Sequence, residues 1–546
     1  MSSTKFSAER MISVHIGNGM ILAMFLQGRE KGNHKMLIEK RSKSMEKKRL
    51  VYGRNMIFFL FSVLCACFLA FYILNASADI VYSDYIRLTN SYLGKPFSLG
   101  DLMTKDILTR IPISFLFREI NIAFFHYSIT FDRFLGLLGL FFTSIPLILF
   151  MAKRRIGIFF SLSLLLIFYS LNKWEMLLNG SGYAHFLSFA VFYIFFYLFS
   201  ERVMKGGSLF SLSIFPLLFL LTGGPYSIAV YVATIFALFV LFPAGKIRDN
   251  RGSMILLFSS FFSTFLYFLS NHYAVYEYAG AESISLKEVL LTKMTFVLKF
   301  FGFGFSSLLF SGENLEEWLR DGTVQGKELF LLGSLILLFF LIMALLFLKD
   351  LFFGEKEIGR EAKQSTSRNH IVDNSVAEKK PDRSLYGLFP ALLLLHGLLS
   401  FALVFLSRYI FLRPEYAVQS RYALQYQSAL LGALLLLYLR NTAKTEDKEI
   451  KCAEKKSGTG KVFLRIFSIA ITLLFLGGTL HTAKTEVLKA PYRRLHYETM
   501  LRSVHRIEEM SEEELENLYE YRHGKERILK AFSILKERKL NCFYEK

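Results

Sequence analysis

The chain has 546 residues, of which 53% are hydrophobic and 58 are phenylalanine, and its formal net charge is +20. This apolar share is higher than soluble globular domains usually carry. The Lys and Arg residues lie in short clusters between apolar runs and not on one soluble face, which disfavours a nucleic-acid-binding protein. The composition therefore predicts an all-α polytopic membrane protein that contacts membrane lipids and binds no nucleic acid.

Residues 1–54 are predicted to form a basic cytoplasmic extension. They contain the segment "KRSKSMEKKRL", Lys40–Leu50, just before the first long apolar run. Lys and Arg are enriched in the cytoplasmic flanks of membrane spans, so this flank is expected to hold the N-terminus in the cytoplasm. The polytopic transmembrane domain is predicted over residues 55–480.

Apolar runs of about 20 residues are long enough to cross a ~30 Å hydrocarbon core, and such runs recur along the chain. Their lengths and their charged flanks predict about eleven membrane spans. The predicted spans are Asn55–Ala76, Phe134–Ala152, Ile156–Leu171, Ala184–Phe199, Leu209–Thr222, Pro225–Phe242, Ser253–Ser270, Leu329–Leu348, Leu385–Leu406, Ala423–Leu439 and Val462–Leu480.

The distribution of basic residues predicts the orientation of these spans. With eleven spans, the loops richest in Lys and Arg all fall on the cytoplasmic side, and the C-terminus is extracytoplasmic. The large extracytoplasmic pieces are then residues 77–133, 271–328 and the tail 481–546. The basic loops are Lys153–Arg155, Lys246–Arg251, Lys349–Arg383 and Arg440–Lys461.

Two of the extracytoplasmic pieces have a predicted local structure. Met294–Phe310 is apolar but is interrupted by Lys299 and two glycines, so it is predicted to lie on or dip into the outer leaflet. The tail 481–546 has a charged helical pattern and is predicted to be a small helical cap or a partner-binding arm.

The first outer loop reads "SADIVYSDYIRLTNSYLGKPFSLGDLMTKDILTRIPISFLF" from Ser77. It contains the acidic residue Asp84, a helical stretch, the turn "LGKPFSLGD" and an apolar segment that begins at Pro112. This order resembles the first extracytoplasmic loop of the GT-C superfamily of integral-membrane glycosyltransferases. The resemblance covers the first four spans, and it implies extracytoplasmic juxtamembrane helices and a sugar donor linked to polyprenyl phosphate.

Asp84 matches the position of the superfamily's catalytic acidic residue. Many relatives have Asp-Glu there, whereas this chain has Asp84 followed by Tyr85, so a second carboxylate would have to come from Asp79 or Asp101. A carboxylate at the membrane boundary can keep its charge and accept a proton from an acceptor hydroxyl. The alternative is that Asp84 caps a helix or is a solvated loop residue.

A donor on a polyprenyl phosphate places its phosphate at the headgroup level, where cations are needed to bind it. Arg421, within "PEYAVQSRYALQYQ", is the main candidate, and Arg408 and Arg413 lie in the same late outer loop. The motif "SRY" at the start of a late span also resembles a feature of bacterial GT-C-like proteins. This resemblance adds Tyr422 to the candidate substrate-binding residues. Arg and Tyr are equally typical of ordinary anchors at a membrane interface.

The short outer loop "NKWEMLLNGSGYAH" combines aromatic side chains with hydrogen-bonding groups, as a sugar-binding loop requires. An aromatic belt with a glycine-containing turn fits the same pattern, and both interpretations stay open. The candidate sugar-binding residues are Lys173, Trp174, Glu175, Tyr183 and His185.

Motifs for several other enzyme classes are absent from the sequence. There is no Walker A motif, no G-x-G-x-x-G and no H-E-x-x-H, which disfavours a nucleotide-driven pump, a dinucleotide enzyme and a zinc protease. His126 and His396 lack a partner ligand four residues away, so no metal site is predicted. A divalent cation remains possible as a cofactor.

The pattern as a whole predicts a multi-pass glycosyltransferase of the cell membrane. It would move a sugar from a polyprenyl-phosphate donor to a glycan, lipid or protein acceptor of the cell envelope, at the outer face. Two alternatives stay open: a polymerase or ligase of lipid-linked saccharides, and a transporter or flippase of such molecules. A polymerase or ligase is expected to place its key arginines in large late outer loops. A transporter or flippase is expected to bury charged residues within its spans.

Overall fold

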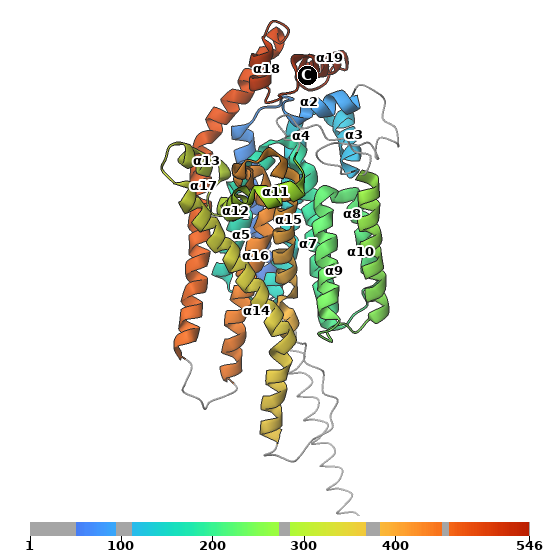
Figure 1. Ribbon diagram of the computed structural model, residues 1–546. Helices are drawn as coiled ribbons and strands as arrows, with labels where there is room; N and C mark the ends of the chain where they lie inside the picture. The colour runs from blue at the N-terminus through green and yellow to red at the C-terminus, as the bar shows by residue number, and fades with distance from the viewer. Residues whose placement is uncertain (1–50, 94–111, 272–283, 367–382, 450–457, 545–546) are drawn as a thin grey trace, which may run out of the picture.

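Helices make up the regular structure of the protein, and no strand occurs in the residues described by its computed structural model, which are 51–93, 112–271, 284–366, 383–449 and 458–544 (Figure 1). Most of the helices run side by side in one bundle. After the first helix, Val51–Ala76, the α-helices are α2 Asp84–Leu88, α3 Ile113–Phe125, α4 Ile129–Lys153, α5 Ile158–Phe168, α6 Trp174–Leu178, α7 Tyr183–Lys205, α8 Ile214–Thr222, α9 Ser227–Leu241, α10 Asn250–Asn271, α11 Leu286–Thr292, α12 Met294–Gly304, α13 Gly312–Arg320, α14 Gly326–Thr366, α15 Leu388–Arg408, α16 Ala423–Glu449, α17 Gly458–Ser503, α18 Glu512–Leu518 and α19 Lys525–Glu537.

Among the described residues, nine helices are long and apolar enough to cross a membrane, so the chain is a multi-pass membrane protein. Two of the eleven predicted spans contain shorter helices. In Ile156–Leu171 only the 11 residues of α5 are α-helical, and in Leu209–Thr222 the helix α8 has nine residues after a 3-10 turn. An 11-residue helix rises about 17 Å, which is less than the ~30 Å hydrocarbon core.

The bundle has two distinct ends. Figure 1 shows α2, α3, α18 and α19 at its upper end, whereas the turn between α9 and α10 and the C-terminal part of α14 lie at its lower end. Several basic residues belong to the lower end: Lys153, the last residue of α4, pairs with Glu201 of α7, and Arg440 of α16 pairs with Asp350 of α14 at 2.5 Å. The predicted basic loops that the structure describes therefore share the lower end.

Helices α4 and α7 run parallel and pack closely. A Cβ at Gly139 of α4 would lie 2.7 Å from the backbone nitrogen of Leu187, so only glycine allows this approach. Lys153 and Glu201 meet at the lower end of the same pair. Because both helices run downward, the segment of α5 and α6 between them must return the chain to the upper end.

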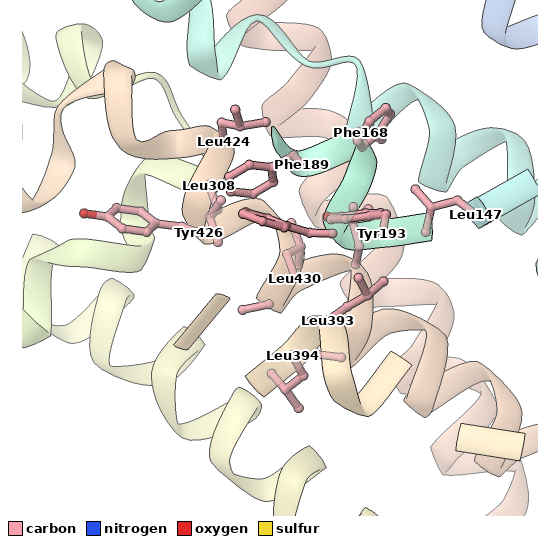
Figure 2. Close-up of a cluster of buried hydrophobic side chains, with 14 of the residues drawn as sticks. Leu147, Phe168, Phe189, Tyr193, Leu308, Leu393, Leu394, Leu424, Tyr426 and Leu430 are labelled. Atoms are coloured by element: carbon pink, nitrogen blue, oxygen red, sulfur yellow. The ribbon is translucent and has the colours of Figure 1, made fainter. Parts of the chain in front are cut away.

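The centre of the bundle is filled by large apolar side chains from α5, α7, α15 and α16 (Figure 2). Phe189 and Tyr193 of α7 are buried beside Leu393 of α15 and Leu430 of α16. Large apolar side chains on the outer helices are exposed instead, as a lipid-facing surface requires; Phe258 of α10 is 70% exposed.

Helix α17 is much longer than the predicted last span. Its 46 residues rise about 69 Å, roughly twice the hydrocarbon thickness, and it continues unbroken past Leu480 to Ser503. The helix therefore continues well beyond the predicted end of the last span at Leu480. The upper half of α17 belongs to the polar upper end of the molecule.

The tail packs against the first loop, as a cap would. Tyr85 and Ile86 of α2 share a buried cluster with Met500 of α17 and Phe532 of α19. The Ser83 N–H donates to the Tyr519 carbonyl at 2.8 Å. These contacts join the first outer loop and the tail, which the sequence predicts as two separate extracytoplasmic pieces.

Some other predicted features of the outer segments can be compared with the structure, and some lie outside the described residues. A helix beginning after Pro112 was predicted and is present as α3. The segment Met294–Phe310, predicted to lie on or dip into the outer leaflet, contains α12, which is bent by 96° relative to α11 at Lys293. The N-terminal extension up to residue 50 and most of the turn "LGKPFSLGD" lie outside the described residues.

Candidate functional site

A cavity of about 1220 Å³ opens at the upper end of the bundle. Its walls come from α2, α6, α13, α17, and the connection between α15 and α16. The cavity is lined by several of the residues that the sequence nominated: Asp84, Trp174, Glu175, His185, Arg408, Arg421 and Tyr422.

Asp84 is the first residue of α2, and its neighbours in the chain are firmly held. Ser83 has a positive φ of 49° and its N–H bonds to the tail. The Tyr85 hydroxyl donates to Asp132 of α4 at 2.6 Å. The Asp84 carboxylate itself makes no hydrogen bond or ion pair with the described part of the chain, and Asp84 lines the cavity.

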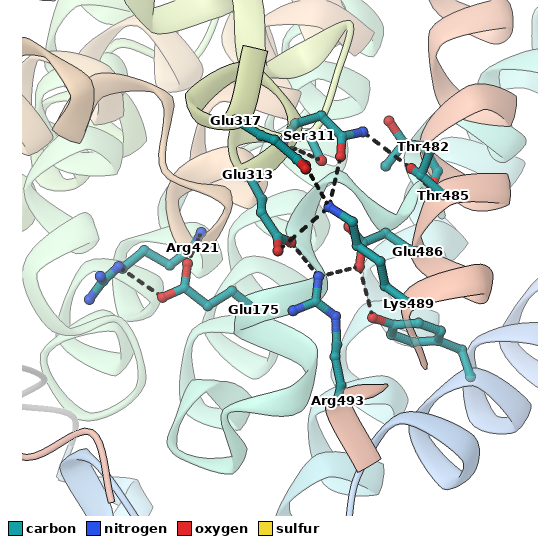
Figure 3. Close-up of polar contacts among 12 residues, drawn as sticks. Glu175, Ser311, Glu313, Glu317, Arg421, Thr482, Thr485, Glu486, Lys489 and Arg493 are labelled. Atoms are coloured by element: carbon teal, nitrogen blue, oxygen red, sulfur yellow. Dashed lines mark hydrogen bonds and ion pairs between the residues drawn. The ribbon is translucent and has the colours of Figure 1, made fainter. Parts of the chain in front are cut away.

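Arg421 and Glu175 form an ion pair across the cavity wall (Figure 3). Arg421 Nε lies 3.2 Å from Glu175 Oε1, and the Arg421 backbone N–H donates to Oε2 at 3.2 Å. The Glu175 carboxylate, and more weakly the Asp84 carboxylate, stabilise the positive charge of Arg421. Beside this pair, Arg408 donates from Nε to the Tyr422 hydroxyl.

A second charged network lines the cavity and was missed in the sequence. Arg493 of α17 pairs with Glu486 at 2.8 Å and with Glu313 of α13, and its guanidinium stacks on the Trp174 ring, 3.3 Å from the centroid. Lys489 pairs with Glu317 at 3.2 Å. Figure 3 shows that these side chains lie beside the Arg421–Glu175 pair.

The spacing of the residues on α17 contains a signal for this network. Glu486, Lys489, Arg493 and Tyr497 are three or four residues apart, which places them along one face of a helix. The signal is usable only if the last span is known to continue as a helix beyond the membrane. The tail adds one more pair to the wall, because His496 Nε2 lies 3.3 Å from Glu520 Oε1.

Asp79, one of the two candidates for a second carboxylate, does not line the cavity. Asp79 accepts hydrogen bonds from the Ser128 hydroxyl at 2.6 Å and from the Ile129 N–H at 2.7 Å, so it caps the start of α4. It also accepts from the Asn541 side chain at 3.2 Å. Asp101 lies outside the described residues.

Lys173 and Tyr183, predicted to bind the sugar, are turned into the protein. Lys173 Nζ donates to the Phe168 carbonyl at 2.7 Å and to Gln427 Oε1 at 3.0 Å, and burial lowers the pKa of Lys173 to about 7. The Tyr183 hydroxyl donates to the Ser114 carbonyl at 2.8 Å. Neither lines the cavity, and Arg413 lines a separate one.

The cavity combines three chemical features. Asp84 supplies an available carboxylate, Arg421 and Arg408 supply cations, and Trp174 with Tyr226 supplies aromatic surface. Such a set can bind a phosphate and a sugar ring and can remove a proton from a hydroxyl group. Over the ranges that the structure describes, no group of three or more His, Cys, Asp or Glu side chains is placed to hold a metal ion.

Comparison of the chain with protein-family models, with curated proteins and with solved structures finds no match in any of the three.

Proposed function

We propose that the protein is an integral-membrane glycosyltransferase of GT-C type, which transfers a sugar from a polyprenyl-phosphate donor to an acceptor of the cell envelope. The observation that supports this proposal most is that Asp84, whose carboxylate has no ion pair or hydrogen bond within the described residues, lines the same cavity as Arg421. These two residues lie more than 300 positions apart in the sequence, and the fold brings them to one cavity.

In the proposed reaction the Asp84 carboxylate takes the proton of an acceptor hydroxyl. The acceptor oxygen then forms a bond to the anomeric carbon of the sugar, the bond between this carbon and the phosphate oxygen breaks, and polyprenyl phosphate leaves with its electron pair. Arg421, with Arg408 nearby, stabilises the negative charge of the leaving phosphate. The displacement inverts the anomeric configuration.

The aromatic side of the cavity suits the sugar. The Trp174 ring is covered on one face by Arg493, which fixes its orientation, and His185 lies in edge contact with Tyr226, with the ring centroids 5.5 Å apart. Rigid aromatic surfaces of this kind bind sugar rings at little cost in conformational entropy. In this proposal Glu175 keeps Arg421 in place until the donor arrives.

The site is proposed to face the outside of the cell membrane. The lower end of the bundle carries the basic segments Lys153–Arg155 and Lys246–Arg251, and short cytoplasmic loops are enriched in Lys and Arg. The upper end with its cavity is then extracytoplasmic.

Reporter fusions test this orientation. A fusion at Lys363, in the lower part of α14, is expected to give a cytoplasmic signal, and a fusion at Glu513, in α18, an extracytoplasmic one. The two reporters should be read in the same strain, with expression of each fusion measured as the control. The reverse pair of signals would place the cavity on the cytoplasmic side.

The activity itself can be tested by mass spectrometry of cell-envelope glycans with and without the gene. The glycosyltransferase proposal predicts that one kind of sugar residue is lost from the envelope while its polyprenyl-phosphate form accumulates. Unchanged glycans and unchanged lipid-linked sugar would contradict it. Loss of a complete glycan, with its lipid-linked precursor intact, would indicate a transporter or flippase instead.

A further inference from the structure

A second cavity of about 580 Å³ adjoins the main one. The two cavities share Glu316, Tyr416 and Gln419 as a common wall. A ligand in the second cavity would therefore lie next to a ligand in the first. The residues that line only the second cavity include Lys299, Arg320, Arg413 and Glu415.

The two cavities differ in whether their basic side chains have carboxylate partners. In the main cavity Arg421, Lys489 and Arg493 each have a carboxylate partner. Lys299 and Arg413, in the second cavity, have no ion pair with any residue in the described part of the chain. Two unpaired cations that face one cavity are available to a ligand that carries negative charge.

The lining of the second cavity as a whole keeps an excess of one positive charge, with three cations and two carboxylates. Arg320 adds a third cation, which within the described residues pairs with its neighbour Asp321 at 3.7 Å, and both of these side chains are exposed. Glu316 and Glu415 are the carboxylates in the lining, so the cations exceed the anions. Phosphate groups are the usual anionic ligands of such Lys and Arg pairs.

The surroundings of the second cavity indicate that its ligand has an apolar chain. Lys299 is on α12, the helix that is bent by 96° relative to α11. Leu291 of α11 and Leu298 of α12 are 73% and 56% exposed. Lipid chains can cover these leucines while the Lys299 ammonium lies at headgroup level, as basic side chains at a membrane interface do.

We propose that the second cavity binds the phosphate-bearing headgroup of a second lipid, the carrier of the acceptor, through Lys299 and Arg413. This inference rests on the proposed function, which assigns the donor lipid to Arg421 in the main cavity. The shared wall at Glu316 and Tyr416 then separates the two headgroups, and the acceptor sugar reaches past it toward Asp84. The acceptor is accordingly a glycan or lipid that carries a phosphate, and not a protein.

Native mass spectrometry of the purified protein with polyprenyl phosphate tests this site. The wild-type protein is expected to bind one more lipid than the double variant Lys299→Ala/Arg413→Ala, whose affinity at this site should fall about tenfold or more. Lys287→Ala, on exposed α11 and outside the cavity lining, is the matched control and should bind as the wild type does. Equal lipid numbers in the wild type and the double variant would overturn the proposal.

Further arms of the experiment separate the possible causes. Polyprenol without phosphate should bind equally to the wild type and the double variant. Inorganic phosphate should not displace the second lipid. Displacement would mean that the second cavity is a site for free phosphate. Arg421→Ala should lose the other lipid and keep this one. If Arg421→Ala loses nothing, the donor assignment fails while the second site stands.

The charge-reversal variant Lys299→Glu/Arg413→Glu should lose the second lipid more completely than the alanine variant. Unchanged thermal unfolding shows that both double variants are folded.

Discussion

Replacing Asp84 by Asn is expected to lower the rate of sugar transfer by about 10²–10⁴-fold, because the amide cannot accept the proton of the acceptor hydroxyl. Size and most hydrogen-bonding capacity are kept. The carboxylate makes no contact with the described residues that would stabilise the fold, so the melting temperature should barely change. The measurement is transfer by purified protein in lipid vesicles, together with thermal unfolding and donor binding.

Asp79→Asn is the informative comparison for Asp84→Asn. The Asp79 carboxylate accepts hydrogen bonds from Ser128, Ile129 and Asn541, so its loss is expected to lower the melting temperature. Its transfer rate, measured well below that temperature, should stay far above the rate of Asp84→Asn. An active Asp84→Asn enzyme would remove the proposed base, and inactivity confined to Asp79→Asn would move the base to Asp79.

Replacing Arg421 by Ala is expected to raise the KM for the donor by about 10–100-fold, since a charged hydrogen bond contributes roughly 1.5–3 kcal/mol. Arg421→Lys should recover only part of this loss, because an ammonium group lacks the planar fork of the guanidinium. Steady-state kinetics with varied donor concentration gives the KM of each variant. Equal KM values for Arg421, Ala and Lys would leave Arg421 as a membrane-interface anchor.

Glu175 supplies the control for the Arg421 prediction. In Arg421→Ala the Glu175 carboxylate loses its ion-pair partner and would repel the donor phosphate. The double variant Arg421→Ala/Glu175→Gln removes this repulsion and should recover some donor binding. Full recovery would show that the single variant failed because of the exposed carboxylate and not because of the missing cation.

The membrane helices were predictable because apolar runs bounded by basic residues reflect burial in lipid directly. The length of each helix was less predictable. Ile156–Leu171 is apolar throughout, but after Phe168 the chain bends so that Lys173 can reach the Phe168 and Ser170 carbonyls. Hydropathy reports which residues avoid water. A bend within an apolar run leaves the hydropathy of that run unchanged, so the end of the helix cannot be read from it.

The candidate site was predictable where the residues lie at the ends of spans, as Asp84, Glu175 and Arg421 do. It was not predictable where tertiary contacts decide which way a side chain points. Lys173 and Glu175 are two residues apart, yet Lys173 bonds to Gln427 in the interior and Glu175 faces the cavity. The sequence holds no local feature that separates these two directions.

The hydrogen bonds between the first loop and the tail constrain the order in which the protein can be assembled. Asp79 and Asn541 are 462 residues apart, and the bond from Ser83 to Tyr519 spans nearly as much of the chain. The loop with Asp84 leaves the ribosome early, but these partners do not exist until almost all of the membrane helices have been made. Synthesis of the bundle must therefore precede completion of the loop that carries Asp84, and a nascent protein has no finished cavity while it is still being synthesised.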